Sequence, residues 1–225
     1  PQKIEKTKGN YEGGYVKEPQ VGSHDWVTSF DLNSLYPNII VQYNMSPETV
    51  VDGLIDTDVE RMLRKQTKIT GKYATAPSGV RFSVDNEGVI PSVIRQYYSE
   101  RRVIKKEMLD AQQEYEQTPT KSLSNKISQL DNQQMAIKIL MNSLYGALGN
   151  RWFRYFDQRV AESITLAGQL SIKWAERAVN TEMNKLLETD KDYVIAIDTD
   201  SLYINMSELV NKFNPKDPVK FLDKI

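Results

Sequence analysis

The sequence has no cysteine and only one histidine, His24, among its 225 residues. The absence of cysteine excludes disulfide bonds and thiolate metal sites, and it fits a reducing compartment. Metal binding or acid–base chemistry would therefore depend mainly on carboxylates, hydroxyls, lysines and arginines. No apolar run approaches the roughly 20 residues of a transmembrane helix, and the N-terminal residues lack the pattern of a signal peptide. We therefore expect no membrane partner.

An excess of charge of either sign is also missing, because 29 Lys and Arg balance 30 Asp and Glu to a net charge of -1. Nucleic-acid-binding domains usually carry a basic excess. The total charge is therefore a weak argument against a nucleic-acid partner, although a balanced total can hide local basic patches. The length supports one or two domains with a core.

The patterns that are present predict an α+β fold. β-branched and aromatic runs predict strands, and alternation of apolar and polar residues predicts a hairpin. Two long charged helical stretches, separated by Thr118-Pro119-Thr120, predict an antiparallel helical hairpin. The expected elements are a strand over 26–32, a helix or turn within 34–43, a short helix over 59–68, a β-hairpin over 79–91, helices over 92–117, 122–144 and 159–187, and a strand–turn–strand over 192–205.

Aspartates stand at the ends of predicted strands. Asp31 follows a strand that we expect to be buried, while Asp198 and Asp200 stand at the turn of the last hairpin. Aspartate is unfavourable in strands and costly to bury unless it is paired or metal-bound. A turn-capping role is the usual explanation for one such aspartate. Two such sites favour convergence on divalent cations, and oxygen ligands without His or Cys indicate Mg²⁺ or Mn²⁺.

The tetrapeptide Ile-Asp-Thr-Asp occurs twice, at 55–58 and at 197–200. The first copy precedes a predicted helix, so we assign Asp56 and Asp58 to helix capping. The second copy lies between apolar strands, so we assign Asp198 and Asp200 to chemistry.

Basic and polar residues share faces of the predicted helical hairpin. Arg101 and Lys105 are four residues apart, and Lys138, Asn142 and Tyr145 follow i, i+4, i+7 spacing. Together the cations could hold a triphosphate, although a solvated charged face remains the alternative for the first two. Lys138 stands in an otherwise apolar stretch. The apolar residues that we expect to pack the hairpin lie on another face: Ile137, Leu140 and Leu144.

Four stretches resemble family B DNA polymerases, in particular those of T-even-type phages. DLNSLYPNII at 31–40, KILMNSLYG at 138–146 and DTDS at 198–201 resemble the three polymerase motifs in order, and YEGGYV at 11–16 resembles the segment before them. DTDS alone would be a weak signal, but the set is specific and spans nearly the whole chain. Ile197, which precedes DTDS, and Asn38, which follows SLYP, depart from the usual residues at these positions, without removing a metal ligand.

The resemblance implies a role for each matching residue. Asp31 and Asp200 would bind two Mg²⁺ ions, and Asp198 would sit beside the ions in a supporting or variable role. The backbone of Leu32 to Leu35 would help to hold the metal and the triphosphate. Arg101, Lys105 and Lys138 would grip the triphosphate, with Lys138 also counted as catalytic. The remaining implied contacts are to the nucleotide from Ser34, Leu35, Tyr36, Asn142, Tyr145 and Gly146, where Tyr36 excludes a ribose 2′-hydroxyl, and to DNA from Tyr11, Gly13 and Gly14.

The resemblance also implies an architecture and partners. A palm would comprise residues 1–89 and 150–225, with an antiparallel sheet and packed helices, and a two-helix fingers hairpin would comprise 90–149. The missing initiator Met and the absent exonuclease and thumb regions suggest a fragment. The implied partners are primer–template DNA and dNTPs, and the candidates for further partners are a separate thumb or exonuclease chain and a sliding clamp. The implied setting is the cytoplasm of an infected bacterium.

Two alternatives to an active polymerase core remain. The chain could be one half of a split polymerase that is active only with a partner chain, or a non-catalytic nucleic-acid-binding relative. The presence of Asp31, Asp200 and Lys138 argues against the second. The SLYP and NSLYG motifs make a reverse transcriptase or an RNA polymerase a poor match.

Overall fold

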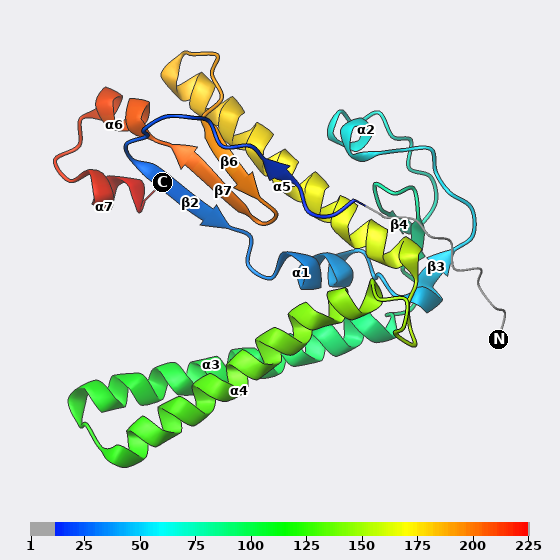
Figure 1. Cartoon of the computed structure of the whole chain (residues 1–225), viewed down its shortest axis with the longest axis horizontal. Helices are drawn as coiled ribbons and strands as arrows, with labels where there is room; N and C mark the ends of the chain where they lie inside the picture. The colour runs from blue at the N-terminus through cyan, green and yellow to red at the C-terminus, as the bar shows by residue number, and fades with distance from the viewer. Residues whose placement is uncertain (1–11, 225) are drawn as a thin grey trace.

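The structure is a computed structural model that describes residues 12–224. It confirms the predicted α+β class, with long helices packed against antiparallel sheets (Figure 1). The elements in chain order are β1 (Val16–Lys17), β2 (Val27–Asp31), α1 (Leu35–Gln42), a 3₁₀ turn (Pro47–Thr49), β3 (Val50–Val51), α2 (Val59–Leu63), β4 (Tyr73–Thr75), β5 (Arg81–Ser83), α3 (Val89–Gln117), α4 (Lys121–Leu148), α5 (Gln158–Leu187), β6 (Val194–Asp198), β7 (Ser201–Asn205), α6 (Ser207–Phe213) and α7 (Pro218–Leu222).

The larger sheet has the strand order β1-β6-β7-β2, and each neighbouring pair is antiparallel. One face is apolar, where Ile197, Leu202 and Ile204 form a core with Ile172 of α5. Because side chains alternate between the faces of a strand, Asp198, Ser201 and Asn205 of the same strands lie on the other face.

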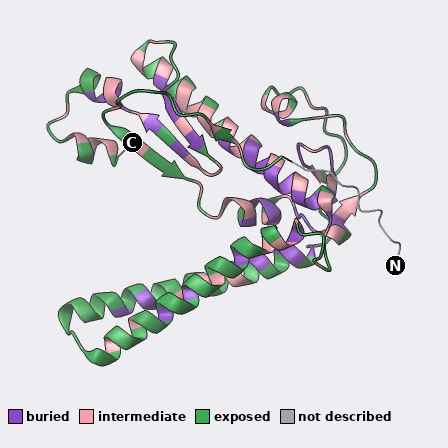
Figure 2. Ribbon diagram, in the orientation of Figure 1, coloured by how far each residue is buried: buried purple, intermediate pink, exposed green. Residues whose placement is uncertain are grey.

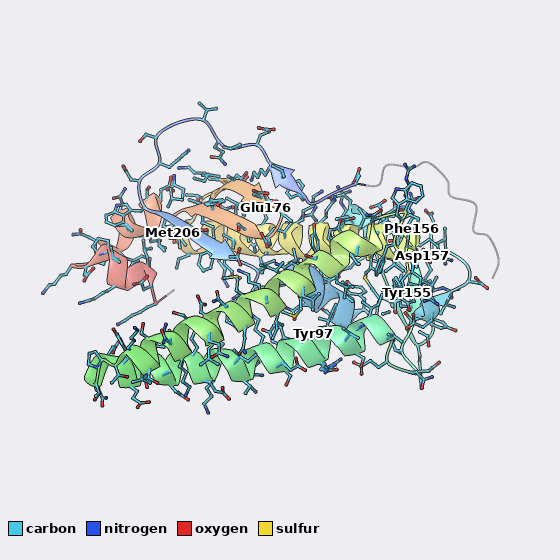
Figure 3. The ribbon with its side chains drawn as sticks, turned by 60° about the horizontal axis from the view of Figure 1, so that its bottom comes forward. Tyr97, Tyr155, Phe156, Asp157, Glu176 and Met206 are labelled. Carbon is cyan, nitrogen blue, oxygen red and sulfur yellow. The ribbon has the colours of Figure 1, made fainter. Side chains whose placement is uncertain are left out.

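β2 lies at the edge of this sheet and is not the buried strand that the sequence predicts. Its only partner among the described strands is β7, and Phe30 keeps 43% of its surface exposed. Asp31 therefore stands at an accessible sheet edge, so burial of its strand is not what makes it unusual. At the opposite edge, Lys17 of β1 forms an ion pair with Glu176, with 2.6 Å between Nζ and Oε1. Glu176 extends from α5 (Figure 3).

A second core forms where α1 meets the smaller sheet, whose strand order is β3-β5-β4. The hairpin predicted over 79–91 is wrong, because β5 pairs with the preceding strands β3 and β4. The residues between β5 and α3 form no strand, and the side chain of Asn44 bonds to the backbone at the end of β5 and in this segment. Its Nδ2 donates to the carbonyls of Ser83 and Asn86, and its Oδ1 accepts from the amide of Gly88. α3 then begins at Val89.

The helical hairpin of α3 and α4 is confirmed, and both helices extend a few residues beyond the predicted bounds. It projects from the rest of the molecule, and its outer surface is exposed (Figure 2). The predicted packing of Leu140 is wrong, because that side chain is 48% exposed, whereas Met141 and Leu148 are buried. None of the described helices combines the length and apolar character needed to cross a membrane.

Candidate active site

The end of β2 and the turn between β6 and β7 bring the predicted acidic residues together at one end of the strands. Asp31 is the register partner of Ser201, whose Oγ donates to Asp31 Oδ2 at 3.1 Å. The Leu32 amide donates to the Asp200 carbonyl at 2.8 Å. Two strands far apart in sequence are thus joined where their carboxylates lie.

The turn between β6 and β7 is tight. The Asp200 amide donates to the Asp198 carbonyl at 2.6 Å, and Thr199 between them has a φ of 55°. That region is unfavourable for a β-branched residue. The Thr199 hydroxyl also donates to Asp198 Oδ1 at 3.1 Å. The turn therefore holds two acidic side chains two residues apart, with Thr199 in a strained conformation.

The charge of these aspartates favours a bound cation. Partial burial, then the charge of Asp31 and to a smaller degree that of Asp198, raises the pKa of Asp200 above its ordinary value. None of the three carboxylates forms an ion pair within residues 12–224. The same region contains no group of three or more His, Cys, Asp or Glu side chains placed to hold a metal ion. Two carboxylates suit Mg²⁺, which usually completes its shell with water and substrate phosphates.

The segment after Asp31 turns sharply into α1, which lies between the sheet and the helical hairpin (Figure 1). Ser34 adopts a left-handed conformation just before the helix. Tyr36 then packs on Tyr145 of α4, with 4.5 Å between the ring centroids. Gly168 of α5 lies behind this ring, since a Cβ there would be 2.9 Å from Tyr36 Cε1.

The carboxylates, α1 and the helical hairpin together enclose a cavity of about 450 Å³. On its hairpin side, Arg101 is held by a bond from its Nε to Gln134 Oε1 at 3.2 Å. The cavity lies between acidic groups of the sheet and basic groups of the hairpin. Its lining consists of Asp31, Asn33, Ser34, Leu35, Tyr36, Pro37, Arg101, Lys138, Asn142, Tyr145, Thr199 and Asp200.

Nine of the individually predicted site residues therefore lie around one cavity. Asn33, from the predicted Leu32–Leu35 backbone segment, lies there too, as do Pro37 and Thr199, which were not predicted. Asn33 and Pro37 lie within the SLYP-containing motif, and Thr199 lies between two selected aspartates. Their position inside these motifs was the available signal. The other predicted residues are not among its lining: Leu32, Lys105, Gly146, Asp198, Gly13 and Gly14, while Tyr11 lies outside the described residues.

The two glycines assigned to DNA lie beside the acidic turn. Gly13 accepts a hydrogen bond at its carbonyl from Gln169 Nε2 at 2.8 Å. Gly14 lies against Thr199, where a Cβ would be 2.7 Å from the threonine Oγ1. A DNA contact by either glycine stays a prediction.

The first copy of Ile-Asp-Thr-Asp lies away from this cavity. Asp58 caps α2, accepting from the Arg61 amide at 2.8 Å, so this assignment is confirmed. The capping role assigned to Asp56 is wrong, because its carboxylate instead pairs with Arg61 NH1 at 2.7 Å. The same four letters thus have different structural roles in two contexts.

Comparisons with known proteins agree with the sequence motifs. The family model described as DNA polymerase family B matches residues 1–213. The DNA-directed DNA polymerase of Escherichia phage RB69 is 32% identical over 263 residues, covering 95% of this chain and 29% of the relative. The corresponding enzyme of Enterobacteria phage T4 is 32% identical over 255 residues, covering 94% and 28%. DNA polymerase 1 of Pyrococcus abyssi (strain GE5 / Orsay) is 35% identical over 217 residues, covering 96% and 24%. The chain thus spans less than a third of each of these relatives.

Proposed function

Because the chain belongs to DNA polymerase family B, we propose that it is the catalytic core of a DNA-directed DNA polymerase that adds dNTPs to a primer 3′-hydroxyl. The observation that supports this proposal most directly is the single cavity shared by Asp31 and Asp200 of the sheet with Arg101 and Lys138 of the helical hairpin. Opposite charges on facing walls suit a nucleoside triphosphate with its divalent cations.

In this proposal, Asp31 and Asp200, with the Leu32 backbone, hold two Mg²⁺ ions, for which Mn²⁺ can substitute. When bound, the ions stabilise negative charge on the phosphates and lower the pKa of the primer hydroxyl. Asp198 supports this pair from the end of β6. The residues then contribute positioning and charge, which dominate catalysis of phosphoryl transfer.

The helical hairpin would hold the triphosphate. Arg101 presents a planar guanidinium suited to phosphate oxygens, and Lys138 faces the same cavity from α4. Lys105 lies one helical turn beyond Arg101, so we assign it to the far end of the triphosphate. Charge on these side chains would stabilise the departing pyrophosphate.

The nucleotide sugar and base would lie nearer α1. Tyr36, fixed by its contact with Tyr145, would exclude a ribose 2′-hydroxyl. Asn142 and Gly146 follow on the same face of α4 and would line the nascent base pair. Ser34 and Leu35 would contribute backbone contacts to the triphosphate. The template strand would pass the N-terminal segment with Tyr11, Gly13 and Gly14.

We further propose that residues 1–89 and 150–225 act as the palm and that residues 90–149 act as the fingers. The candidates for further partners in this proposal are a separate thumb or exonuclease chain and a sliding clamp. The proposed setting is the cytoplasm of a phage-infected bacterium.

The test is primer extension on a primed DNA template with dNTPs and Mg²⁺ or Mn²⁺, comparing the chain with its Asp200→Asn variant. We expect a loss of at least about 1,000-fold in the variant, because one side of the metal pair loses its charge. An Asp56→Asn variant is the matched control, since this exposed aspartate belongs to the other copy of the tetrapeptide and lies outside the cavity.

Full activity of Asp200→Asn would overturn the assignment. If neither protein extends the primer, the same comparison is repeated with a thumb-bearing polymerase chain added. Extension restored only with the unsubstituted chain would favour the split-polymerase alternative. DNA binding without extension in every combination would favour the non-catalytic alternative.

A further inference from the structure

Gly14 and Thr199 are in closer contact than a side chain at position 14 would allow. An ideal Cβ on Gly14 would lie 2.7 Å from Thr199 Oγ1, 2.8 Å from its Cγ2 and 3.1 Å from its Cβ. All three atoms belong to one threonine side chain. The φ of Gly14 lies outside the left-handed range, so its backbone suits any residue and the restriction is steric.

Hydrogen bonds hold the chain in place both before and after Gly14. The Tyr15 carbonyl accepts from the Thr199 amide at 2.9 Å, and Val16 pairs in register with Asp198. On the other side, Gln169, which is 8% exposed, donates to the Gly13 carbonyl. The segment cannot move away from the turn without breaking bonds on one side or the other.

The residue that Gly14 contacts, Thr199, has a strained backbone conformation. Thr199 has a φ of 55°, a conformation that a β-branched residue holds only where its surroundings over-determine it. The bond from its amide to Tyr15 and the bond between the Asp200 amide and the Asp198 carbonyl are two of these restraints. The same turn orients Asp200, which faces the cavity next to Asp31.

We propose that Gly14 is a positioning residue for the acidic turn. Its missing side chain lets the segment from Gly13 to Val16 support Thr199, and this support holds Asp200 beside Asp31. Gly14 acts through Thr199 and needs no contact with DNA or nucleotide to do so. The proposal rests on the proposed function only where it equates the position of Asp200 with cation binding.

The chain provides a matched control and a rescue. Gly13 is adjacent, and a Cβ built there meets nothing within 4 Å, so Gly13→Ala tests the loss of a glycine without the clash. Thr199→Gly removes all three atoms that a Cβ at position 14 would meet. Introducing Gly14→Ala into both the unsubstituted chain and the Thr199→Gly variant therefore isolates the contact in a double-mutant cycle.

The first measurement is Mn²⁺ affinity of the whole chain without DNA, followed by electron paramagnetic resonance of free Mn²⁺. We expect Gly14→Ala to weaken binding about 10-fold or more, as for residues that orient metal ligands. Gly13→Ala should stay within about twofold. On the Thr199→Gly background, Gly14→Ala should weaken binding by less than about twofold. An equal loss on both backgrounds, or none on either, would overturn the proposal.

If Mn²⁺ binding does not depend on Asp200, a second measurement still tests whether Gly14 supports the turn. That result would remove the metal site of the proposed function but would leave the support of the turn open to test. Hydrogen exchange at the Thr199 amide reports its bond to Tyr15 directly. Faster exchange in Gly14→Ala but not in Gly13→Ala supports the positioning role, and unchanged exchange in both refutes it.

Discussion

Asp200 lies close to two other aspartates, and this closeness has a measurable effect on stability. Burial and the charge of Asp31 raise its pKa in the folded chain above the ordinary value of 3.8. The folded state therefore binds a proton more tightly than the unfolded state does, and the ionised form costs stability at neutral pH. This cost disappears as pH falls through the folded pKa toward the unfolded one.

Asp200→Asn should therefore raise the Tm at pH 7 in the absence of divalent cations. Because Asp200 is only partly buried, the gain should be below about 1 kcal/mol, or at most about 2–4 °C for a chain of this size. The gain should shrink as pH is lowered from 7 to 4. Thermal unfolding followed by circular dichroism measures both effects. Asp190→Asn, at an exposed loop position, is the control, and a Tm lowered at pH 7 by Asp200→Asn would contradict the prediction.

Two glycines within long helices should respond in opposite ways to alanine. In α5, a Cβ on Gly168 would meet Tyr36 Cε1 at 2.9 Å, whereas in α4 a Cβ on Gly146 meets nothing within 4 Å. Gly146→Ala should stabilise the chain by about 0.5–1 kcal/mol through helix propensity. Gly168→Ala should instead destabilise it by about 1–3 kcal/mol, because the Tyr36 ring must shift against Tyr145. Urea unfolding of both variants tests the pair.

A spectroscopic measurement shows whether the effect of Gly168→Ala arises at the ring pair of Tyr36 and Tyr145 or from packing elsewhere. Gly168→Ala should also shift the near-ultraviolet signal of the tyrosines, since the ring pair of Tyr36 and Tyr145 is disturbed. Equal stability changes in the two variants would show that the close approach of Gly168 to Tyr36 has no energetic effect.

The long elements of this chain were predictable from local patterns, while the short ones depended on tertiary partners. The helices over 89–117, 121–148 and 158–187 carry strong signals, such as the break at Thr118-Pro119-Thr120. The segment after Ser83 resembled a hairpin, but the Asn86 carbonyl and the Gly88 amide bond to the side chain of Asn44, more than 40 residues earlier. No local pattern contains that information.

Most residues that line the cavity could be predicted from the three polymerase motifs, because these motifs are far apart in sequence but meet at the cavity. The sequence could not show that Gly14 lies against Thr199, since that contact depends on the pairing of β1 with β6. It also could not separate Asp56, which pairs with Arg61, from Asp58, which caps α2. Both aspartates precede the same helix, but only Asp58 stands at the N-cap position, where its carboxylate accepts from the Arg61 amide.

The candidate site lies where the two cores of the molecule meet. The sheet core with α5 supplies the carboxylates, and the core around α1 supplies Tyr36 and the roots of α3 and α4. Helix α1 contacts α3, α4 and α5. Movement of the helical hairpin relative to the sheet would therefore change the distance between its cations and the aspartates.

The hairpin should open more easily at its far end than at its root. Between Ala111 and Leu130 no described residue is buried, so the tip is held by exposed helix contacts and by the cap from Thr120. Exposed helical turns with few buried contacts lie at the low end of local stability. Hydrogen exchange measured by mass spectrometry should thus give protection at least about 10-fold lower at the tip than in the middle of α5.

Adding a dNTP with Mg²⁺ should increase the exchange protection near Arg101 and Lys138 but leave that of the hairpin tip unchanged. Uniform protection along the hairpin would contradict this gradient, and a nucleotide effect confined to the tip would contradict the placement of the triphosphate at the root.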